Sequence, residues 1–321
     1  MVPALPRAAS VNGMRIAILD DFQDVSREYG DFSGLDVTVF TEPLTDVAAQ
    51  LAEFDGVVAM RERTRFPADV LRSLPRLRLL VSTGRRNAAI DLDAASELGI
   101  TVCHTGYRPA AAAEHTWALI LAALRHVPTE DANVRAGRWQ STVGAELEDA
   151  VLGLVGLGNL GKRVARVAAA FGMEVIAWSS NLDAERAAEA GVTAVTKQEL
   201  FARADVVTIH YVLSERSRGI VGAEDIARMK PGALLVNTSR SGVLDTRAAA
   251  DAARLGDIRL ALDVFDAEPL PADDPIRDLP NSVLTGHVGY VTEQQYRLFY
   301  ADAAEDVRAY LAGAPVRVMN P

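Results

Sequence analysis

The sequence contains very little cysteine: Cys103 is the only one among 321 residues. A single cysteine excludes an intramolecular disulfide and points to a reducing compartment. Long hydrophobic runs are also missing, because the longest apolar helical candidate, Thr116 to Leu124, is about half of the roughly 18 residues that a membrane span needs. We therefore expect a cytoplasmic protein that does not cross a membrane.

Basic residues are too few for a nucleic-acid partner. The chain has 33 Lys and Arg against 43 Asp and Glu, which gives a net charge of −10. Neutralising a phosphate backbone needs clustered Lys and Arg, so we expect no nucleic acid to bind. No cluster of His or Cys has metal-ligand spacing, and we expect no metal. What the chain has is 49% apolar residues, enough for a large core in two domains.

Short apolar runs alternate with helix-length segments, a pattern typical of parallel βαβ units. The first series predicts strands at residues 14–20, 36–40, 56–60 and 79–82. The second series predicts six strands, which begin at residues 151, 174, 205, 234, 260 and 283. Six is the strand count of a full dinucleotide-binding sheet.

Two helix-length segments suggest how the domains connect. The alanine-rich stretch 110–127 is expected to be one long helix that crosses between domains, and 293–311 has helical spacing. We expect the second helix to return to the first domain. The prediction is therefore a discontinuous substrate domain (14–112 and 291–321), a nucleotide domain (113–290) and a poorly ordered lead-in (1–13).

A glycine-rich turn follows the strand that begins at Val151. Gly156, Gly158 and Gly161 form a Gly-x-Gly-x-x-Gly pattern that opens the helical run 162–171. In such a turn the glycines allow a tight bend, a close approach of the diphosphate and close helix packing, and the helix N-terminus favours negative charge. Alone, the pattern could be a flexible turn, but its strand–turn–helix context predicts a dinucleotide site in a Rossmann-type domain.

An acidic residue is missing where the ribose hydroxyls of NAD are usually held, about 20 residues after the turn. The strand 174–178 ends in Ser179, Ser180 and Asn181. No carboxylate stands there to repel a 2′-phosphate. No arginine follows immediately to bind one, because Arg186 lies well into the next helix. The site could accept either coenzyme, NAD(H) or NADP(H), and we lean slightly to NADP(H).

Three reactive side chains end apolar runs in the last quarter of the chain: Arg240, Glu268 and His287. The carboxyl ends of parallel strands converge on one crevice, so a cation, an acid and an imidazole can meet there. Alone, each has an ordinary structural interpretation: a surface ion pair, a turn cap or a core histidine. Behind a dinucleotide turn, the set predicts hydride transfer to a 2-keto acid.

Each of the three has a chemical task in that reaction. An imidazole can donate a proton to the carbonyl oxygen as negative charge develops there. Glu268, if ionised beside His287, stabilises the imidazolium and fixes which nitrogen faces the substrate. Arg240 offers a planar fork for the substrate carboxylate.

The ordered motifs resemble the D-isomer-specific 2-hydroxyacid dehydrogenase family over nearly the whole chain after Met14. The glycine turn with 171–175 resembles its cofactor signature, 229–242 its arginine motif, 262–270 its glutamate motif and 284–290 its histidine motif. The resemblance implies a Rossmann-type nucleotide domain, a flavodoxin-like substrate domain and a homodimer whose nucleotide domains pair. It also implies an NAD(P)-dependent oxidoreductase that interconverts a small 2-keto acid and its D-2-hydroxy acid.

The resemblance also implies the site residues. Arg240, Glu268 and His287 are the catalytic set, and Asp263 is expected to contact the nicotinamide carboxamide. The cofactor-binding residues are Gly156, Gly158, Asn159, Leu160, Gly161, Ser179, Ser180, His210, Thr238, Ser239, Arg240, Asp263, His287 and Gly289. Departures from the family pattern include Ser241 and Gly286, where glycine and proline are usual.

The loop 83–88 departs further, because it replaces a glycine-rich segment that holds the substrate carboxylate in relatives. Arg85, Arg86 and Asn87 are the predicted substrate-binding residues there, together with Arg240 and His287. The two arginines would suit a second anionic group on the substrate, or they could be solvated and balance an acidic surface. Two other functions stay open: an NADPH-dependent glyoxylate or hydroxypyruvate reductase, and a non-catalytic, corepressor-like NAD(H) sensor.

Overall fold

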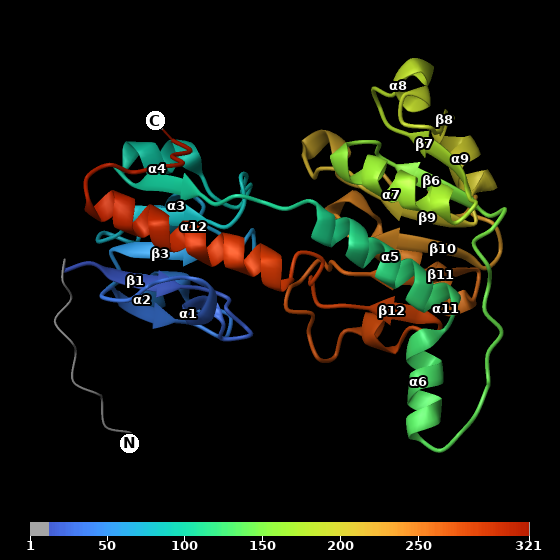
Figure 1. Ribbon diagram of the computed structural model, residues 1–321, viewed down its shortest axis with the longest axis horizontal. Helices are drawn as coiled ribbons and strands as arrows, with labels where there is room; N and C mark the ends of the chain where they lie inside the picture. Colours follow the sequence, from blue (N-terminus) through green and yellow to red (C-terminus); the bar gives the residue numbers. More distant parts are fainter. Residues whose placement is uncertain (1–12, 321) are drawn as a thin grey trace. The chain divides into compact units, whose positions relative to one another are not determined.

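A computed structural model describes residues 13–320 (Figure 1). The predicted lead-in, 1–13, lies outside the described residues except for Gly13. The chain divides into two compact units: unit 1 runs to Arg108 and resumes at Val291, and unit 2 is Pro109–Tyr290. In the described part, no helix is both long and apolar enough to cross a membrane.

Unit 1 contains one parallel sheet of five strands in the order β2-β1-β3-β4-β5. The strands are β1 (Arg15–Ile18), β2 (Asp36–Val39), β3 (Gly56–Ala59), β4 (Leu79–Ser82) and β5 (Thr101–His104). The helices are α1 (Ser26–Tyr29), α2 (Val47–Leu51), α3 (Ala68–Arg72), α4 (Leu92–Glu97) and α12 (Glu293–Leu311). Helix α12 packs on α1, β4 and β5, and Phe299, Ala303 and Val307 on its apolar face are fully buried.

Unit 2 contains a parallel sheet of seven strands in the order β12-β11-β10-β9-β6-β7-β8. The strands are β6 (Val151–Val155), β7 (Glu174–Trp178), β8 (Thr193–Ala194), β9 (Val206–Ile209), β10 (Ala233–Asn237), β11 (Ile258–Leu262) and β12 (Ser282–Leu284). The helices are α5 (Ala110–Leu124), α6 (Val127–Arg135), α7 (Asn159–Ala170), α8 (Ala184–Ala188), α9 (Lys197–Arg203), α10 (Ala223–Ile226) and α11 (Thr246–Leu255). Three short 3-10 turns complete it: η1 (Glu215–Ser217), η2 (Ser241–Val243) and η3 (Pro275–Asp278).

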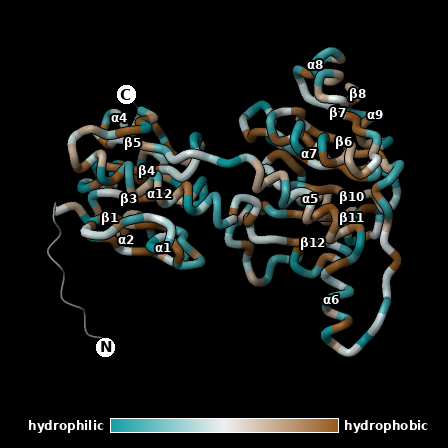
Figure 2. The backbone as a smooth tube through the Cα atoms, viewed as in Figure 1, coloured by the Kyte–Doolittle hydropathy of each residue, from teal (hydrophilic) through white to brown (hydrophobic). Residues whose placement is uncertain are grey.

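The core of unit 2 explains why its strands are apolar on both faces. Along β10, Leu234 and Val236 pack into one hydrophobic cluster, whereas Leu235 packs into the cluster on the opposite face. Helices α5 and α7 supply the first cluster, and α9, α10 and α11 supply the second. Because alternate side chains of a strand point to opposite faces, a sheet covered on both sides reads as a continuous apolar run. The hydrophobic colouring of β10 and β11 in Figure 2 follows this arrangement.

The two parallel α/β sheets confirm the predicted fold class. The structure adds two strands that the sequence did not indicate, β5 and the two-residue β8. The prediction of a single helix over 110–127 was wrong at its C-terminal end. Helix α5 stops at Leu124, and His126 adopts a left-handed φ of 53° before α6 begins. Pro128 follows in the first turn of α6, where the N–H that proline lacks would have no partner within the helix.

The segment after α12 pairs with the edge strand β5 of unit 1. His104 N–H donates to the carbonyl of Arg317, and Met319 N–H donates to the carbonyl of Val102. The Arg317 guanidinium donates to the carboxylate of Asp306, which is fully buried, and to Glu305. Burial raises the pKa of Asp306 to about 7, although Arg317 acts in the opposite direction.

This raised pKa has a consequence for stability. Between the ordinary value of 3.8 and about 7, the native state holds a proton on Asp306 that the unfolded chain has released. This group therefore lowers the free energy of unfolding as the pH rises through that window, by at most about 1.4 kcal/mol per pH unit.

We predict that Asp306→Asn gains stability relative to the wild type as the pH rises from 4 to 7. Asparagine keeps an oxygen for Arg317 and cannot ionise. Urea unfolding followed by circular dichroism at several pH values measures the difference. A difference that stays constant over this range would contradict the prediction.

Candidate active site

The carboxyl ends of β10, β11 and β12 lie at one edge of the unit 2 sheet. Asn237 of β10 is in register with Leu262 of β11, which is in register with Leu284 of β12. Neighbouring strands are about 4.8 Å apart, so the segments that follow them start close together. Arg240, Glu268 and His287 follow these three strands in that order.

His287 and Glu268 are in direct contact. Nδ1 of His287 lies 2.6 Å from Oε2 of Glu268, and the two side chains are 15% and 27% exposed. Oε1 of Glu268 accepts a hydrogen bond from the N–H of Phe265, 2.9 Å away, which fixes the carboxylate. The rings of His287 and Tyr290 form a T-shaped pair, with their centroids 5.5 Å apart. Since Nδ1 is used by Glu268, Nε2 is the nitrogen left for other chemistry.

Arg240 follows β10 and is held by the turn in which it lies. Nη1 of Arg240 donates to the carbonyl of Ser239, and its own carbonyl accepts from Nδ2 of Asn237. Oδ1 of Asn237 accepts from the N–H and hydroxyl of Ser239. The hydroxyl of Thr238 lies 2.8 Å from that of Thr116 on α5. Asn237 shapes this turn, a role that sequence reasoning did not assign to it.

Asp263 follows β11 directly and is fully buried. Its Oδ1 accepts from the hydroxyl of Thr285 at 2.6 Å and the N–H of Val288 at 2.8 Å, and its Oδ2 accepts from the N–H of Gly289 at 2.9 Å. Burial acts to raise the pKa of Asp263, but hydrogen bonds from His115 and Thr285 outweigh it, and the pKa is lowered. Its predicted contact with a carboxamide stays a prediction.

The glycine turn joins β6 to α7 in the same sheet. Gly156 has a φ of +103°, and a Cβ at Gly161 would overlap the carbonyl oxygen of Gly156. Gly158 is the N-cap of α7 and offers no side chain to the first N–H groups of the helix. A Cβ at Gly158 would meet no atom within 4 Å. Asn159 and Leu160 lie in the first turn, and among the described residues no side chain at the N-cap accepts from the first N–H groups of the helix.

The segment after β7 contacts an aromatic residue, Tyr211, that sequence reasoning missed. The hydroxyl of Tyr211 lies 2.8 Å from the N–H of Ser180 and 3.0 Å from its hydroxyl, and its ring stacks on Trp178. The next carboxylate along the chain, Asp183, caps α8 by accepting from the N–H of Arg186. Ser179 precedes this cluster and is half-buried.

His210 directly follows β9, and its carbonyl oxygen lies against Gly156. The residue is half-buried, and loss of solvation lowers the pKa of its ring to about 4, so the ring is neutral near pH 7. Nε2 lies 3.2 Å from the hydroxyl of Thr208. Among the contacts found within residues 13–320, Nδ1 has no hydrogen-bond partner.

The predicted substrate loop belongs to unit 1 and follows β4. Arg85 and Arg86 are exposed, whereas Asn87 is buried. Nδ2 of Asn87 donates to the carbonyl of Arg61 and the hydroxyl of Ser82, which shapes the loop. Substrate contacts by these three residues stay predictions.

Arg61, which follows β3, is a further guanidinium at this edge of the unit 1 sheet. It donates from Nη1 to the carbonyl of Thr83 and lies over the ring of Tyr107. Gly84 has a φ of +90°, and a Cβ there would overlap Nη1 of Arg61. The position of Arg61 just after a predicted strand was the available signal, and sequence reasoning did not use it.

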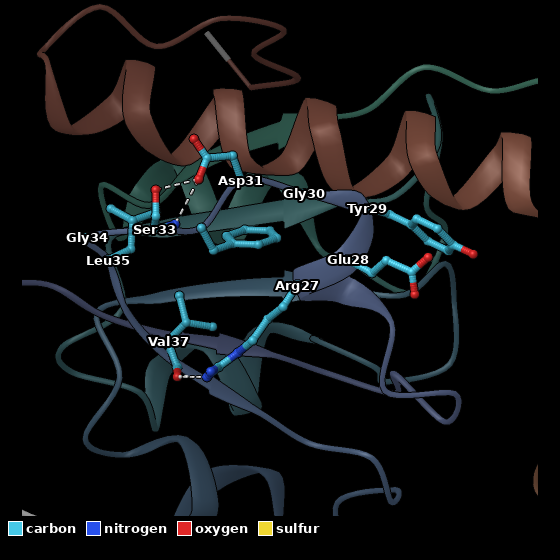
Figure 3. A pocket seen from close by; sticks show the side chains of 10 residues that line it. Arg27, Glu28, Tyr29, Gly30, Asp31, Ser33, Gly34, Leu35 and Val37 are labelled. Carbon is cyan, nitrogen blue, oxygen red and sulfur yellow. Dashed lines mark hydrogen bonds between the residues drawn. The ribbon is translucent and has the colours of Figure 1, made fainter.

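A cavity of about 630 Å³ lies elsewhere in unit 1, between α1 and the start of β2 (Figure 3). Two of its polar side chains bond to neighbouring lining residues: Asp31 accepts from the N–H and hydroxyl of Ser33, and Arg27 donates to the carbonyl of Val37. None of the predicted site residues lines it. In the described part of the chain, no group of three or more His, Cys, Asp or Glu side chains is arranged to hold a metal ion.

Comparison with known proteins gives three consistent relationships. Residues 117–289 match the family model described as D-isomer specific 2-hydroxyacid dehydrogenase, NAD binding domain. D-3-phosphoglycerate dehydrogenase of Mycobacterium leprae is 37% identical over 273 residues, which cover 84% of this chain and 51% of that protein. D-3-phosphoglycerate dehydrogenase of Bacillus subtilis is 33% identical over 284 residues, 87% of this chain and 54% of that protein.

The structural comparison agrees with the sequence comparison. The crystal structure of a phosphoglycerate oxidoreductase from Vibrio cholerae has a TM-score of 0.90 and 37% identity, and covers 94% of this chain and 100% of that chain. The chain spans about half the length of the curated relatives it matches. The family model and these relatives together show that the chain belongs to the D-isomer specific 2-hydroxyacid dehydrogenase family.

Proposed function

We propose that the protein is an NAD(P)-dependent oxidoreductase that interconverts a small 2-keto acid and its D-2-hydroxy acid. The observation that carries the proposal is the 2.6 Å contact between Nδ1 of His287 and Glu268, at the sheet edge that also bears Arg240. A carboxylate-backed imidazole with its second nitrogen available is a general acid and base.

The residues fit a nicotinamide dinucleotide. The open space at Gly158, the uncapped start of α7 and the close packing that needs Gly161 are the features of a diphosphate site. Gly156, Gly158, Asn159, Leu160 and Gly161 would hold the diphosphate. Ser179 and Ser180 would face the ribose, and His210, Thr238, Ser239, Asp263 and Gly289 would border the rest of the coenzyme.

In the reduction, His287, Glu268 and Arg240 each have a separate role. A reduced nicotinamide, when bound, supplies a hydride to the carbonyl carbon of the 2-keto acid. The π electron pair of the carbonyl moves to its oxygen, and that oxygen takes a proton from Nε2 of His287. Glu268 stabilises the imidazolium before the transfer, and a neutral imidazole remains. Arg240 binds the substrate carboxylate, and the reverse reaction uses the same groups.

The substrate class is the finer part of the proposal. The relatives named above act, by their names, on phosphoglycerate, a hydroxy acid with a second anionic group. The exposed Arg85 and Arg86 would suit such a group. Arg61 bonds the carbonyl of Thr83 in the same loop and adds a third positive charge there. We therefore propose a 2-keto acid with a second anion, and glyoxylate or hydroxypyruvate as the alternative.

The coenzyme proposal keeps the lean to NADP(H). The strand end itself, Ser179 to Asn181, has no carboxylate to repel a 2′-phosphate, and the first one after it, Asp183, caps α8. A screen of both coenzymes should give the lower Michaelis constant for NADPH. A strong preference for NADH would reverse the lean.

We also propose a homodimer. Val134, Trp139 and Val143, on α6 and the segment after it, are large apolar residues that are 57%, 75% and 93% exposed. Figure 1 shows α6 and this segment extending from the sheet of unit 2. Exposed apolar groups of this size mark association surfaces, and a second copy of the chain is the proposed occupant.

We predict that wild-type protein oxidises NADPH or NADH in the presence of 2-keto acids, and that His287→Ala lowers kcat about 10²- to 10⁴-fold. Coenzyme affinity should stay within about twofold, because His287 acts on the substrate oxygen. His126→Asn, which removes a histidine outside the site, is the control. Coenzyme binding without turnover of any 2-keto acid would support a sensor, and full activity in His287→Ala would remove this residue from the mechanism.

We predict that Gly158→Ala and Gly161→Ala differ in their effects. A methyl at Gly158 enters open space, so the fold stays intact while coenzyme affinity falls about tenfold or more. A methyl at Gly161 overlaps the turn backbone, so the free energy of unfolding also falls by about 1–3 kcal/mol. Quenching of tryptophan fluorescence by coenzyme and urea unfolding measure the two effects. Equal stability loss in both variants would contradict this assignment.

We predict that Trp139→Glu combined with Val143→Glu converts the dimer to a monomer, because two charges would be buried in the interface. Sedimentation equilibrium of the variant and of the wild type measures the change. The exposed Val212→Glu, on another loop of unit 2, is the control. A wild-type monomer would refute the dimer.

A further inference from the structure

Several groups of the loop that carries His287 donate hydrogen bonds to one buried carboxylate, that of Asp263. Asp263 accepts hydrogen bonds from Thr285, Val288 and Gly289, all within 2.6–2.9 Å. These residues flank His287 on both sides. His287 itself has a φ of +56°, a conformation that a residue with a Cβ adopts rarely unless its surroundings impose it. The orientation of the imidazole therefore depends on the position of Asp263.

A fourth contact to this carboxylate comes from a different element. His115 lies in the first turns of α5, and its Nε2 is 3.2 Å from Oδ1 of Asp263 and 3.0 Å from the hydroxyl of Thr285. The hydroxyl of Thr285 has one proton, which it donates to Asp263 at 2.6 Å. It can therefore only accept from His115, so Nε2 of His115 must carry a proton. His115 donates to both partners.

We infer that His115 is a positioning residue for the reaction: its Nε2–H holds Asp263 and Thr285, and through them keeps His287 oriented toward Glu268. The inference rests on the proposed function, because the reaction uses His287. His115 itself touches neither His287 nor Glu268 in the contacts found among the described residues. Its effect must therefore pass through the loop.

The position of His115 in the chain gives the contact a further meaning. Helix α5 begins where the chain enters unit 2, and Thr285 to Gly289 come just before the chain leaves it at Tyr290. Asp263 thus joins the entry helix to the exit loop. A buried, ionised carboxylate is costly unless donors surround it, so each donor has a strong effect on the arrangement.

The test compares two substitutions of the same residue. His115→Leu removes the donor but keeps the bulk, whereas His115→Gln places an amide N–H near the position of Nε2. We expect His115→Leu to lower kcat about 10- to 100-fold, the effect of losing a hydrogen bond to a charged group. We expect His115→Gln to retain at least about a third of wild-type kcat. Coenzyme affinity, measured by tryptophan fluorescence, should stay within about twofold in both.

A spectroscopic readout makes the test independent of turnover. In the wild type, the proton on Nδ1 of His287 should give a low-field NMR signal because of its bond to Glu268, and the signal is assigned by its loss in His287→Ala. His115→Leu should weaken or shift this signal, and His115→Gln should keep it. The chain has five histidines, so the spectrum is simple. His126→Asn is the control, and both readouts should be unchanged.

Two results would overturn the inference. One is a His115→Leu variant with kcat and the His287 signal as in the wild type. The other is a His115→Gln variant that loses as much as His115→Leu. If the wild type turns over no 2-keto acid, the proposed function fails, and the NMR comparison still decides whether His115 holds His287. If His115→Leu does not fold, Thr285→Val takes its place with the same expected losses.

Discussion

The parallel pairing of β10, β11 and β12 is the constraint on which the candidate site depends. Parallel strands all end at the same edge of a sheet, so the segments that follow them must begin as neighbours. This brings Nδ1 of His287 to 2.6 Å from Oε2 of Glu268, a residue 19 positions earlier in the chain. The same sheet presents the glycine turn after β6, two strands further along.

Two carboxylates follow strand β11, and their surroundings give them different tasks. Asp263 is fully buried, has a lowered pKa and accepts bonds from the loop that carries His287. Glu268, a few residues later, is partly exposed and bonds the imidazole itself. One carboxylate thus shapes the backbone and the other orients the ring. An imidazole with its first nitrogen fixed presents the second one in a defined direction.

Most strands of both sheets, but not β5 or β8, could be predicted from sequence because their apolar runs are continuous and regularly spaced. β8 could not, because two residues carry no pattern, and the break at His126 could not, because a histidine gives no sequence signal for a left-handed φ of 53°. The site followed from reactive residues at strand ends. Tyr211 and Arg61 were missed because their contacts, with Ser180 and with Thr83 and Tyr107, depend on loop conformation. His115 could not be linked to Asp263, since the two are joined only by the fold.

We propose that this sheet edge brings a 2-keto acid and a reduced nicotinamide into direct reaction. Reduced coenzyme with deuterium at the transferred position of C4 tests it most directly, with the 2-keto acid in ordinary water. We expect a D-2-hydroxy acid with one deuterium on C2 and none lost to solvent, as detected by mass spectrometry. A product without deuterium at C2, or no product with any 2-keto acid, would contradict it.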